Sequence, residues 1–321
     1  MLRVDDLRTF YRTRQGLLKA VDGVSFNLEK GEILGLVGES ACGKTTVALS
    51  IIRLLPSVAE VMGGRILFQG DDLLGKTERA MRDVRWGKIS IIFQGALNSL
   101  NPVLPVKEQI AEAMKAHGNV TGAEVDATIT RLFKAVGLDP ERRSNYPHEF
   151  SGGMKQRIMI AMALACNPEI VIADEPTTAL DVIVQRQILE LIRTLRDEFH
   201  ISMILITHDL SVVAQLCDRA VIMYAGKVVE IGDIHRIFES PTHPYTRALL
   251  KSIPKMEVAK TRELSYIPGS VPDLAGPVPA CRFYGRCPYG QKVCQDVEPR
   301  LDQTYPDSFV ACHFWRHLSE R

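Results

Sequence analysis

Gly38 and Gly43 enclose four residues in the stretch GESACGKTT, and Lys44, Thr45 and Thr46 follow directly. Residues of these types at this spacing are typical of a loop whose backbone N–H groups surround the phosphates of a nucleoside triphosphate. In such a loop the lysine reaches the outer phosphates and the first threonine holds Mg²⁺. The alternative is an ordinary glycine turn between a strand and a helix, and the neighbouring elements must decide between the two.

The elements on either side favour the phosphate loop. Residues 33–37 (ILGLV) form an apolar run that predicts a short buried strand, and residues 46–55 predict the start of a helix. The N-terminus of a helix presents free N–H groups and the positive end of its dipole, which together attract an anion. We therefore expect this loop to bind a nucleoside triphosphate.

Two acids in tandem, Asp174 and Glu175, follow the apolar run IVIA. A buried strand that exposes two carboxylates at its end can hold Mg²⁺ with one of them and orient the attacking water with the other. Acids on the surface after a strand are a common alternative, but a tandem pair behind a phosphate loop favours catalysis.

A second candidate anion site is Ser151-Gly152-Gly153, in the stretch EFSGGMKQR. These residues precede a predicted helix and would offer another cluster of free N–H groups. Taken alone, a Ser-Gly-Gly sequence is an ordinary loop. It precedes the acid pair by the length of one helix, which strengthens the interpretation as a binding site.

The remaining pattern predicts how these loops are held. Residues 1–31 alternate polar and apolar positions, as antiparallel strands with turns at Asp22-Gly23 and Lys30-Gly31 would. Residues 107–166 show helical periodicity. Further strands are expected at 63–74 as a hairpin, at 90–94, 169–174 and 202–209, and at 219–233 with a turn at Ala225-Gly226. Alternating strands and helices around a phosphate loop predict a mostly parallel α/β core with a helical insertion.

Composition limits the functional class. The 321 residues are 46% hydrophobic and carry a formal charge of +1, so they can form a sizeable core, and no nucleic acid partner is expected. The longest uncharged apolar stretch, residues 158–167, is far shorter than the roughly 20 residues of a bilayer span. The N-terminus shows no apolar signal region. A cytosolic chain is expected.

Four of the seven cysteines, Cys281, Cys287, Cys294 and Cys312, lie close together near the C-terminus. Cytosolic cysteines seldom form disulfides, and four thiolates suit tetrahedral zinc or an iron–sulfur cluster. The absence of a C-x-x-C pair favours a [4Fe–4S] cluster over Zn²⁺, with unmetallated thiols as the third possibility. From Ser252 onwards five prolines exclude long regular elements, so a separate loop-rich extension is expected; these are Pro254, Pro268, Pro272, Pro277 and Pro279.

The order of motifs resembles that of ATP-binding-cassette (ABC) ATPases over essentially the whole chain. These motifs are GESACGKT, the glutamine loop at Gln94, the signature FSGGMKQR, the acid strand IVIADE, the ALD loop at Ala179 to Asp181, and the histidine of THD, His208. The resemblance implies an α/β fold: an ABC-type P-loop NTPase core with an antiparallel β subdomain and a helical subdomain. It implies an ATPase domain over 1–250, with the helical subdomain inserted at about 95–166, and a loop-rich, cysteine-containing extension over 251–321.

The resemblance also implies residue roles. Two cassettes would pair head to tail, so that Ser151 and Gly153 of one contact the γ-phosphate bound by the other. Gln94 would contact Mg²⁺ and water and couple to a membrane partner, Glu175 would activate water, and His208 would clamp the γ-phosphate, with a structural histidine as the alternative. The implied ATP-binding residues are Tyr11, Gly38, Ser40, Cys42, Gly43, Lys44, Thr45, Thr46, Ser151, Gly153 and Asp181. The implied Mg²⁺ ligands are Thr45, Gln94 and Asp174, and the implied catalytic residues are Lys44, Gln94, Glu175 and His208.

Some residues depart from the family pattern or leave alternatives open. Tyr11 would stack on adenine, although the adjacent Phe10 could do so instead. Ala41 stands where relatives often have glycine, so the loop is strained if this position needs a positive φ. Cys42 is either a thiolate stabilised among N–H groups, whose alkylation would block nucleotide, or a passive small residue. Phe150 replaces the usual leucine, a tolerable apolar exchange.

The C-terminal stretches ESPTHPYTRALLKSIP and CRFYGRCPYGQKVCQ resemble the extension of oligopeptide, dipeptide and nickel importer ATPases. Some relatives hold a [4Fe–4S] cluster there, which supports the cysteine assignment. His313, beside Cys312, is either a further ligand or a bystander.

The resemblance implies an ATPase subunit that powers import of oligopeptides or dipeptides from the cytoplasmic face of the cell membrane. Its partners would be a second cassette, identical or paralogous, two membrane permease subunits and, indirectly, an extracytoplasmic solute-binding protein. The same type of importer for oligosaccharides or nickel is an alternative. A soluble ABC ATPase in translation or DNA repair, and a regulatory cassette that binds ATP without turnover, are alternatives from other classes.

Overall fold

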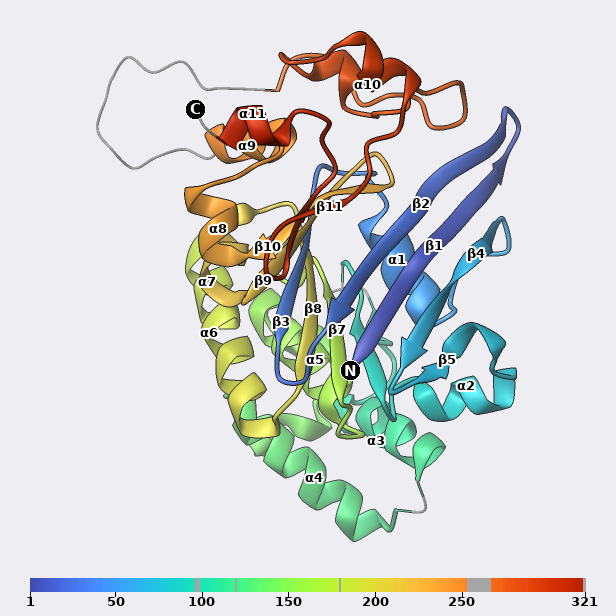
Figure 1. The fold of residues 1–321 in the computed structure, drawn as a ribbon. Helices are drawn as coiled ribbons and strands as arrows, with labels where there is room; N and C mark the ends of the chain where they lie inside the picture. Colours follow the sequence, from blue (N-terminus) through green and yellow to red (C-terminus); the bar gives the residue numbers. More distant parts are fainter. Residues whose placement is uncertain (96–98, 119, 179, 253–266, 320–321) are drawn as a thin grey trace. The chain divides into compact units, whose positions relative to one another are not determined.

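The structure is a computed structural model that describes residues 1–95, 99–118, 120–178, 180–252 and 267–319 of the chain. Figure 1 shows the ribbon of the chain, and the contacts between its residues divide it into two compact units. The first unit comprises Met1–Asn27, Leu34–Leu74 and Thr207–Arg321, and the second comprises Leu28–Ile33 and Gly75–Ile206. Among the helices in these described ranges, none combines the length and the apolarity that crossing a membrane requires.

An antiparallel sheet opens the first unit. Its strand order is β2-β1-β4-β5, with β1 at Leu2–Thr13, β2 at Gly16–Leu28, β4 at Ala59–Phe68 and β5 at Asp71–Asp72. Apolar side chains alternate along β1, so that Leu2, Val4 and Leu7 are buried while their neighbours face outward. The predicted alternation and the hairpin at 63–74 are therefore confirmed.

The predicted turn at Asp22-Gly23 is wrong, because both residues lie inside β2. The strand continues through them with Val21 and Val24 fully buried, so the apolar pattern outweighs the local turn signal. Gly23 adopts φ 82°, which lets the long strand bend without leaving the sheet. The turn between β1 and β2 instead lies at residues 14–15.

The first unit also carries strands β3 at Ile33–Val37, β9 at Arg219–Tyr224, β10 at Lys227–Asp233, β11 at Asp302–Tyr305 and β12 at Ser308–Val310. Strand β3 is buried throughout and runs parallel to β9, as its continuous apolar run predicts. The predicted turn at Ala225-Gly226 is confirmed, since it joins β9 to its antiparallel partner β10. Strand β12 then pairs with the other edge of β10, which no local pattern predicted.

The helices of the first unit are short. They are α1 at Lys44–Ile51, α7 at Leu210–Leu216, α8 at Ile234–Glu239, α9 at Pro244–Lys251, α10 at Lys292–Asp296 and α11 at Trp315–Ser319, with 3₁₀ turns η1 at Leu73–Gly75 and η5 at Tyr284–Arg286.

Helix α1 begins two residues before the expected Thr46 and ends before the expected Leu55. It ends early because Arg53 takes a left-handed conformation, φ 53°, just after the C-cap.

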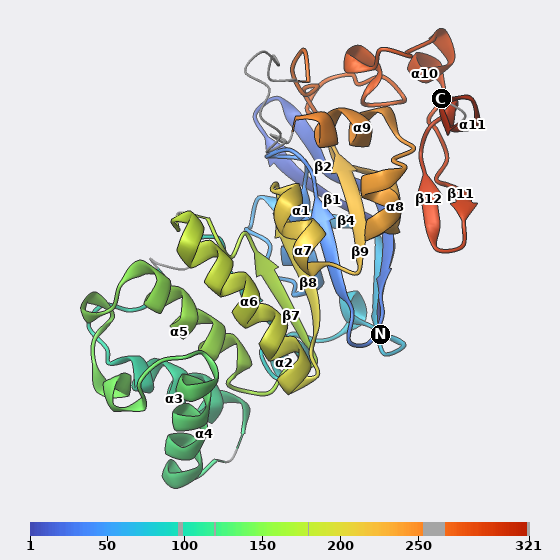
Figure 2. The ribbon, with the colours of Figure 1, turned by 90° about the vertical axis from the view of Figure 1, so that its left-hand side faces the viewer.

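The second unit contains a parallel sheet of three strands, β6 at Ile89–Ile92, β7 at Ile170–Asp174 and β8 at Ser202–Thr207. Helix α2 spans Glu78–Val84, and the long amphipathic α6 spans Val182–Phe199 (Figure 2). These parallel strands confirm the expected α/β core.

The predicted helical region is confirmed as α3 at Val106–His117, α4 at Gly122–Ala135 and α5 at Gly152–Leu164, with 3₁₀ turns η3 at Pro140–Ser144 and η4 at Pro147–Glu149. The three helices pack on one another (Figure 2). Helix α4 starts with a capping box, in which Thr121 and Glu124 satisfy each other's backbone N–H groups.

Candidate functional site

The predicted phosphate loop connects β3 to α1 in the first unit. Gly38 and Gly43 leave no room for a side chain, because neighbouring backbone lies too close. A Cβ atom on Gly38 would lie 2.1 Å from the carbonyl oxygen of Met223, and one on Gly43 would lie 2.2 Å from that of Ala20. Gly43 is also the N-cap of α1 and adopts φ 103°. Glycine at these two positions thus lets the loop pack directly against neighbouring backbone. Gly43 also places the N-terminus of α1 at the end of the loop.

Lys44 folds back over this loop. Its Nζ donates to the carbonyl oxygens of Gly38 at 2.7 Å and Glu39 at 2.9 Å, and the residue is only 5% exposed. A buried ammonium group held by neutral carbonyls would gain from an anionic partner, because charge-assisted hydrogen bonds are the stronger kind. Ser40 and Thr45 are exposed at the surface of the loop, whereas Thr46 is buried.

Tyr11 on β1 reaches the helix that follows the loop. Its hydroxyl shares a 3.2 Å hydrogen bond with the hydroxyl of Thr46. Phe10, the alternative partner for a base, has its ring 5.9 Å from the ammonium of Lys19. The structure therefore brings Tyr11 next to the loop.

Ala41 departs from the family pattern, and Cys42 has two alternatives, a stabilised thiolate and a passive small residue. Ala41 adopts φ 62°, the left-handed region that glycine occupies without strain, so the condition for a strained loop is met. Cys42 is 2% exposed, and burial raises the pKa of its thiol even though Lys44 acts in the opposite direction. A raised pKa keeps the thiol protonated, which argues against the thiolate alternative and favours a passive small residue.

The second unit brings together Gln94, Glu175 and Thr178. Glu175 Oε2 accepts a hydrogen bond from Gln94 Nε2 at 2.8 Å and another from Thr178 Oγ1 at 3.0 Å. Glu175 follows β7 with φ 48°, and its backbone N–H donates to the carbonyl oxygen of Ile206 at 2.9 Å. Asp174 is the last residue of β7 and is 2% exposed. The carboxylate of Glu175 is thus held in one orientation at the end of the parallel sheet.

The predicted signature and the ALD loop each begin a helix. Ser151 is the N-cap of α5 and accepts from Met154 N at 3.4 Å, and Asp181 is the N-cap of α6 and accepts from Val184 N at 2.9 Å. The two helix starts touch, because a Cβ on Gly153 would lie 2.6 Å from Val184 Cγ1.

Some predicted residues lie outside the described ranges or on other elements. Ala179 of the ALD loop, residues 96–98 and residues 253–266 with Pro254 lie outside the described residues. His208 follows β8 and is exposed, and Asp209 after it is the N-cap of α7. The phosphate loop, Tyr11 and His208 belong to the first unit, and the other predicted nucleotide-site residues belong to the second.

The four C-terminal cysteines line one small cavity. It measures about 20 Å³ and is bordered by Cys281, Cys287, Cys294 and Cys312 together with the rings of Phe283, Tyr284, Tyr289 and Phe314. The backbone also links two of these residues, since Cys281 N donates to Cys294 O at 2.8 Å. Burial raises the pKa of the Cys281 and Cys312 thiols to about 11 and that of Cys287 above its usual value.

The four thiol groups are the cysteine donors that this cavity offers to a metal group. Across the part of the chain that the structure describes, no group of three or more His, Cys, Asp or Glu side chains is arranged to hold a metal ion. His313 Nε2 lies 2.9 Å from the carbonyl oxygen of Val297, and His313 also lines the cavity, so both alternatives for this residue stay open.

Three functional candidates were missed by sequence reasoning. Glu39 lies inside the phosphate loop, and Arg282 and Arg286 lie beside cysteines of the C-terminal segment, by which we mean residues 267–319. Glu39 and Arg286 form an ion pair, with Oε2 2.8 Å from Nη1. The Glu39–Arg286 pair joins residues 247 positions apart, so no local pattern predicts it. The sequence indicated these residues only by placing them next to predicted site residues.

Comparison with known families matches two models. The model described as "ABC transporter" matches residues 21–178, and the model described as "Oligopeptide/dipeptide transporter, C-terminal region" matches residues 229–294.

Curated relatives match almost the whole chain. The chain is 49% identical to "Probable peptide ABC transporter ATP-binding protein y4tR" of Sinorhizobium fredii, over 98% of this chain and 95% of the relative. It is 48% identical to "Dipeptide transport ATP-binding protein DppD" of Bacillus subtilis, over 93% of this chain and 90% of the relative.

Solved structures with the same fold include the ATP-binding cassette MJ0796, described as a dimer in a post-hydrolysis state bound to ADP and phosphate. Its TM-score is 0.65 at 26% identity, over 73% of this chain and 99% of that one. The structure of cbiO1 from Clostridium perfringens, part of the transporter complex cbiONQ, also has a TM-score of 0.65 at 26% identity, over 75% of this chain and 91% of that one.

Proposed function

Because the chain belongs to the ATP-binding proteins of ABC transporters, we propose that it hydrolyses ATP to power import of oligopeptides or dipeptides through a separate membrane permease. One observation carries the peptide assignment: relatives named for peptide and dipeptide transport match this chain over nearly its full length at close to half identity. The match of residues 229–294 to the C-terminal region of oligopeptide/dipeptide transporters supports it independently of the ATPase motifs.

In the first unit, the phosphate loop would hold the nucleotide. Lys44 already donates to the loop carbonyls of Gly38 and Glu39, and moving its ammonium to the β- and γ-phosphates would exchange neutral acceptors for charged ones. Backbone N–H groups at the start of α1 would add the helix dipole. Gly38, Ser40, Cys42, Gly43, Thr45 and Thr46 complete the proposed loop contacts, with Tyr11 at the adenine and His208 at the γ-phosphate.

In the second unit, Glu175 would act on the attacking water. Gln94 and Thr178 already orient its carboxylate by hydrogen bonds. The side chain of Glu175 would therefore not need to change rotamer before it acts as a base. Thr45, Gln94 and Asp174 are the proposed ligands of Mg²⁺, which would neutralise charge on the phosphates.

The signature would complete the site of a partner cassette. Ser151, Gly153 and Asp181 lie at two contacting helix N-termini, where free N–H groups suit a phosphate of another chain. We propose a head-to-tail dimer with an identical or paralogous cassette, bound to two membrane permease subunits at the cytoplasmic face of the membrane. A solute-binding protein outside the membrane would then deliver the peptide to the permease.

We also propose that Cys281, Cys287, Cys294 and Cys312 hold a [4Fe–4S] cluster. Support comes from the donor set, four thiols that border one cavity among aromatic rings. Among the described residues no group is arranged for a metal ion, so the proposal rests on the donor set alone. When bound, it would tie together four points of a segment with few regular elements.

Iron and acid-labile sulfide analysis of anaerobically purified protein tests the cluster. We expect iron and sulfide in equal amounts, and their loss in Cys294→Ser but not in Cys217→Ser, which changes a buried cysteine outside the cavity. Zinc without sulfide would support the alternative metal, and neither element would leave four thiols with no cofactor.

Uptake by cells tests the proposed function. Cells that lack the chain should lose uptake of labelled peptides, and the wild-type chain should restore it whereas Glu175→Gln should not. Mass spectrometry of proteins that co-purify from native membranes in mild detergent should recover two permease subunits and a second cassette. Loss of nickel or oligosaccharide uptake instead would assign another cargo, and recovery of ribosomal or DNA-repair proteins would overturn the transport proposal.

A further inference from the structure

Glu39, the second residue of the phosphate loop, is held from outside the loop by the C-terminal half of the chain. Its two carboxylate oxygens accept from both terminal nitrogens of Arg286, at 2.8 Å for Oε2–Nη1 and 3.1 Å for Oε1–Nη2. Its backbone N–H donates to the hydroxyl of Tyr245 at 3.0 Å. A planar bidentate pair with a third bond to the backbone fixes both the side chain and the main chain at this position.

Arg286 is itself fixed. Its side chain is 7% exposed, and it also donates to the carbonyl oxygens of Ile267 and Pro268, each at 3.0 Å, and to the Tyr224 hydroxyl at 3.2 Å. The rings of Tyr224, Tyr245 and Phe283 meet below it, with centroids 4.7 to 5.4 Å apart. The guanidinium therefore has little freedom to follow the loop if the loop moves.

The position of Arg286 depends on the two cysteines that flank it. It ends the 3₁₀ turn η5 between Cys281 and Cys287, where Tyr284 N donates to Cys281 O at 3.0 Å and Cys287 N donates to Tyr284 O at 3.2 Å. Both cysteines line the thiol cavity. A change in the spacing of these two sulfur atoms would therefore move the turn that carries Arg286.

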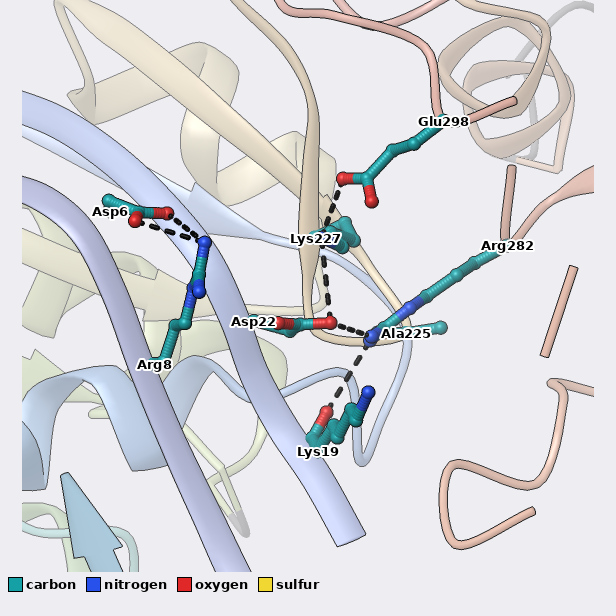
Figure 3. Close-up of polar contacts among 8 residues, drawn as sticks. All are labelled: Asp6, Arg8, Lys19, Asp22, Ala225, Lys227, Arg282 and Glu298. Atoms are coloured by element: carbon teal, nitrogen blue, oxygen red, sulfur yellow. Dashed lines mark hydrogen bonds and ion pairs between the residues drawn. The ribbon is translucent and has the colours of Figure 1, made fainter. Parts of the chain in front are cut away.

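A second arginine beside a cysteine contacts a turn that borders the other end of the loop. Arg282, next to Cys281, donates to the carbonyl oxygens of Ala225 and Lys19 and forms an ion pair with Asp22 (Figure 3). Figure 3 also shows Lys227 between Asp22 and Glu298. Its Nζ lies 3.5 Å from Asp22 Oδ2 and 2.6 Å from Glu298 Oε1.

The turn that Arg282 contacts is bonded to the phosphate loop. Gly226 N donates to the carbonyl oxygen of Cys42 at 2.9 Å. A Cβ on Gly226 would lie 2.7 Å from Arg282 Nη1, so the turn and the guanidinium are in direct contact. The C-terminal segment thus touches the loop at Glu39 directly and at Cys42 through this turn.

We propose that the C-terminal segment positions the phosphate loop through Arg286 and Arg282, so that the state of the four-cysteine site sets the affinity of the loop for nucleotide. Arg286 is a positioning residue that acts through Glu39 and makes no contact with the nucleotide itself. The dependence on the cysteine site rests on the proposed cluster, whereas the role of Arg286 does not.

Nucleotide affinity of the full chain tests the positioning role, with ADP–Mg²⁺ as the probe because it is not hydrolysed. We expect Arg286→Ala to raise the Kd for ADP by about 5- to 20-fold, since a mostly buried charge-assisted pair is lost, and Arg286→Lys to recover only part of this. Lys292→Ala is the matched control, because it removes an exposed ion pair of the same segment, with Asp296, that does not touch the loop. It should leave the Kd within about twofold.

A double-mutant cycle separates positioning from simple stabilisation. Arg286→Ala, Glu39→Gln and the double variant are compared both in ADP Kd and in thermal midpoint. Positioning predicts that the two substitutions are non-additive in Kd, with the double variant no weaker than Arg286→Ala alone. Coupling in the thermal midpoint with an unchanged Kd would overturn the proposal, and Glu39→Gln supplies the measurement if Arg286→Ala does not fold.

The link to the cysteine site is tested by comparing anaerobically prepared protein with the same protein after oxidation and chelation. We expect loss of the metal group to raise the Kd for ADP by about fivefold in the wild type and to have little effect in Arg286→Ala. Equal Kd values for loaded and stripped wild type would overturn the link. If analysis finds no metal or sulfide at all, the proposed cofactor fails, while the Arg286 measurements still decide the positioning role.

Discussion

Gln94 Nε2 lies 2.8 Å from Glu175 Oε2 and donates a hydrogen bond to it. Gln94 follows β6 and Glu175 follows β7, which are adjacent parallel strands, so their ends bring the amide and the carboxylate together. The same carboxylate oxygen also accepts from Thr178. A carboxylate held by two donors is fixed in direction, as expected of a group that must meet a water molecule in one geometry.

Removal of the Glu175 charge should abolish most turnover without weakening nucleotide binding. We expect Glu175→Gln to lower the ATPase rate by about 100-fold or more, because a general base contributes roughly 10²- to 10⁴-fold. Glu190→Gln, which changes an exposed glutamate of α6, is the control. Phosphate release and ADP binding are the measurements, and a wild-type rate in Glu175→Gln would mean that another group acts as the base.

Removal of the amide that orients Glu175 should have a smaller effect. Gln94→Ala removes one hydrogen bond that orients the carboxylate and keeps the bond from Thr178, so we expect about a tenfold lower ATPase rate and an ADP Kd close to that of the wild type. Steady-state kinetics with titrated ATP separate the rate from the affinity. An unchanged rate would show that the hydrogen bond seen here does not contribute to turnover.

Glycine at position 41 should stabilise the loop. Ala41 adopts φ 62°, which costs alanine about 1–2 kcal/mol and glycine almost nothing, while glycine loses about 0.5–1 kcal/mol more chain entropy. Ala41→Gly should therefore raise the free energy of unfolding by about 0.5–1 kcal/mol in urea denaturation. Ala127→Gly in the exposed face of α4 is the opposite control and should lower it by about 1 kcal/mol. A loss of stability in both variants would contradict the strain.

Cys42 should react slowly with alkylating agents. Its thiol is buried and its pKa is raised, so the thiolate fraction at neutral pH is small, and the labelling rate should rise as pH rises towards that pKa. Peptide mapping after iodoacetamide treatment should find Cys42 labelled in unfolded but hardly in folded protein, and Cys42→Ser should keep the ATPase rate within about twofold. Fast labelling that ATP prevents would restore the thiolate alternative.

Elements with a strong local pattern could be predicted from the sequence. The apolar run of β3, the periodic helices from α3 to α5 and the Ala225-Gly226 turn all follow from neighbouring residues, and the structure has them where expected. The phosphate loop was predicted for the same reason, since Gly38, Gly43 and Lys44 lie in one short stretch of sequence. The continuous β2 was missed because burial of Val21 and Val24 outweighs the turn tendency of Asp22-Gly23.

Contacts between distant residues could not be predicted in this way. The Glu39–Arg286 pair joins residues 247 positions apart, and nothing in the residues around Glu39 indicates a basic partner. The pairing of β12 with β10 also joins distant residues, and the three residues of β12 are too few for a strand pattern. The cysteines indicated a common site by their number, but their shared cavity depends on the folding of the whole C-terminal segment.

The pairing of Ile231 with Phe309 has a consequence for solubility. Strand β10 would otherwise end the sheet with a free edge of valine and isoleucine, and such edges recruit strands from other molecules. The short hairpin of β11 and β12 covers that edge and presents the polar strand DQTY in its place. We therefore expect a chain that stops at residue 250, and so exposes this edge, to aggregate more readily than the full chain.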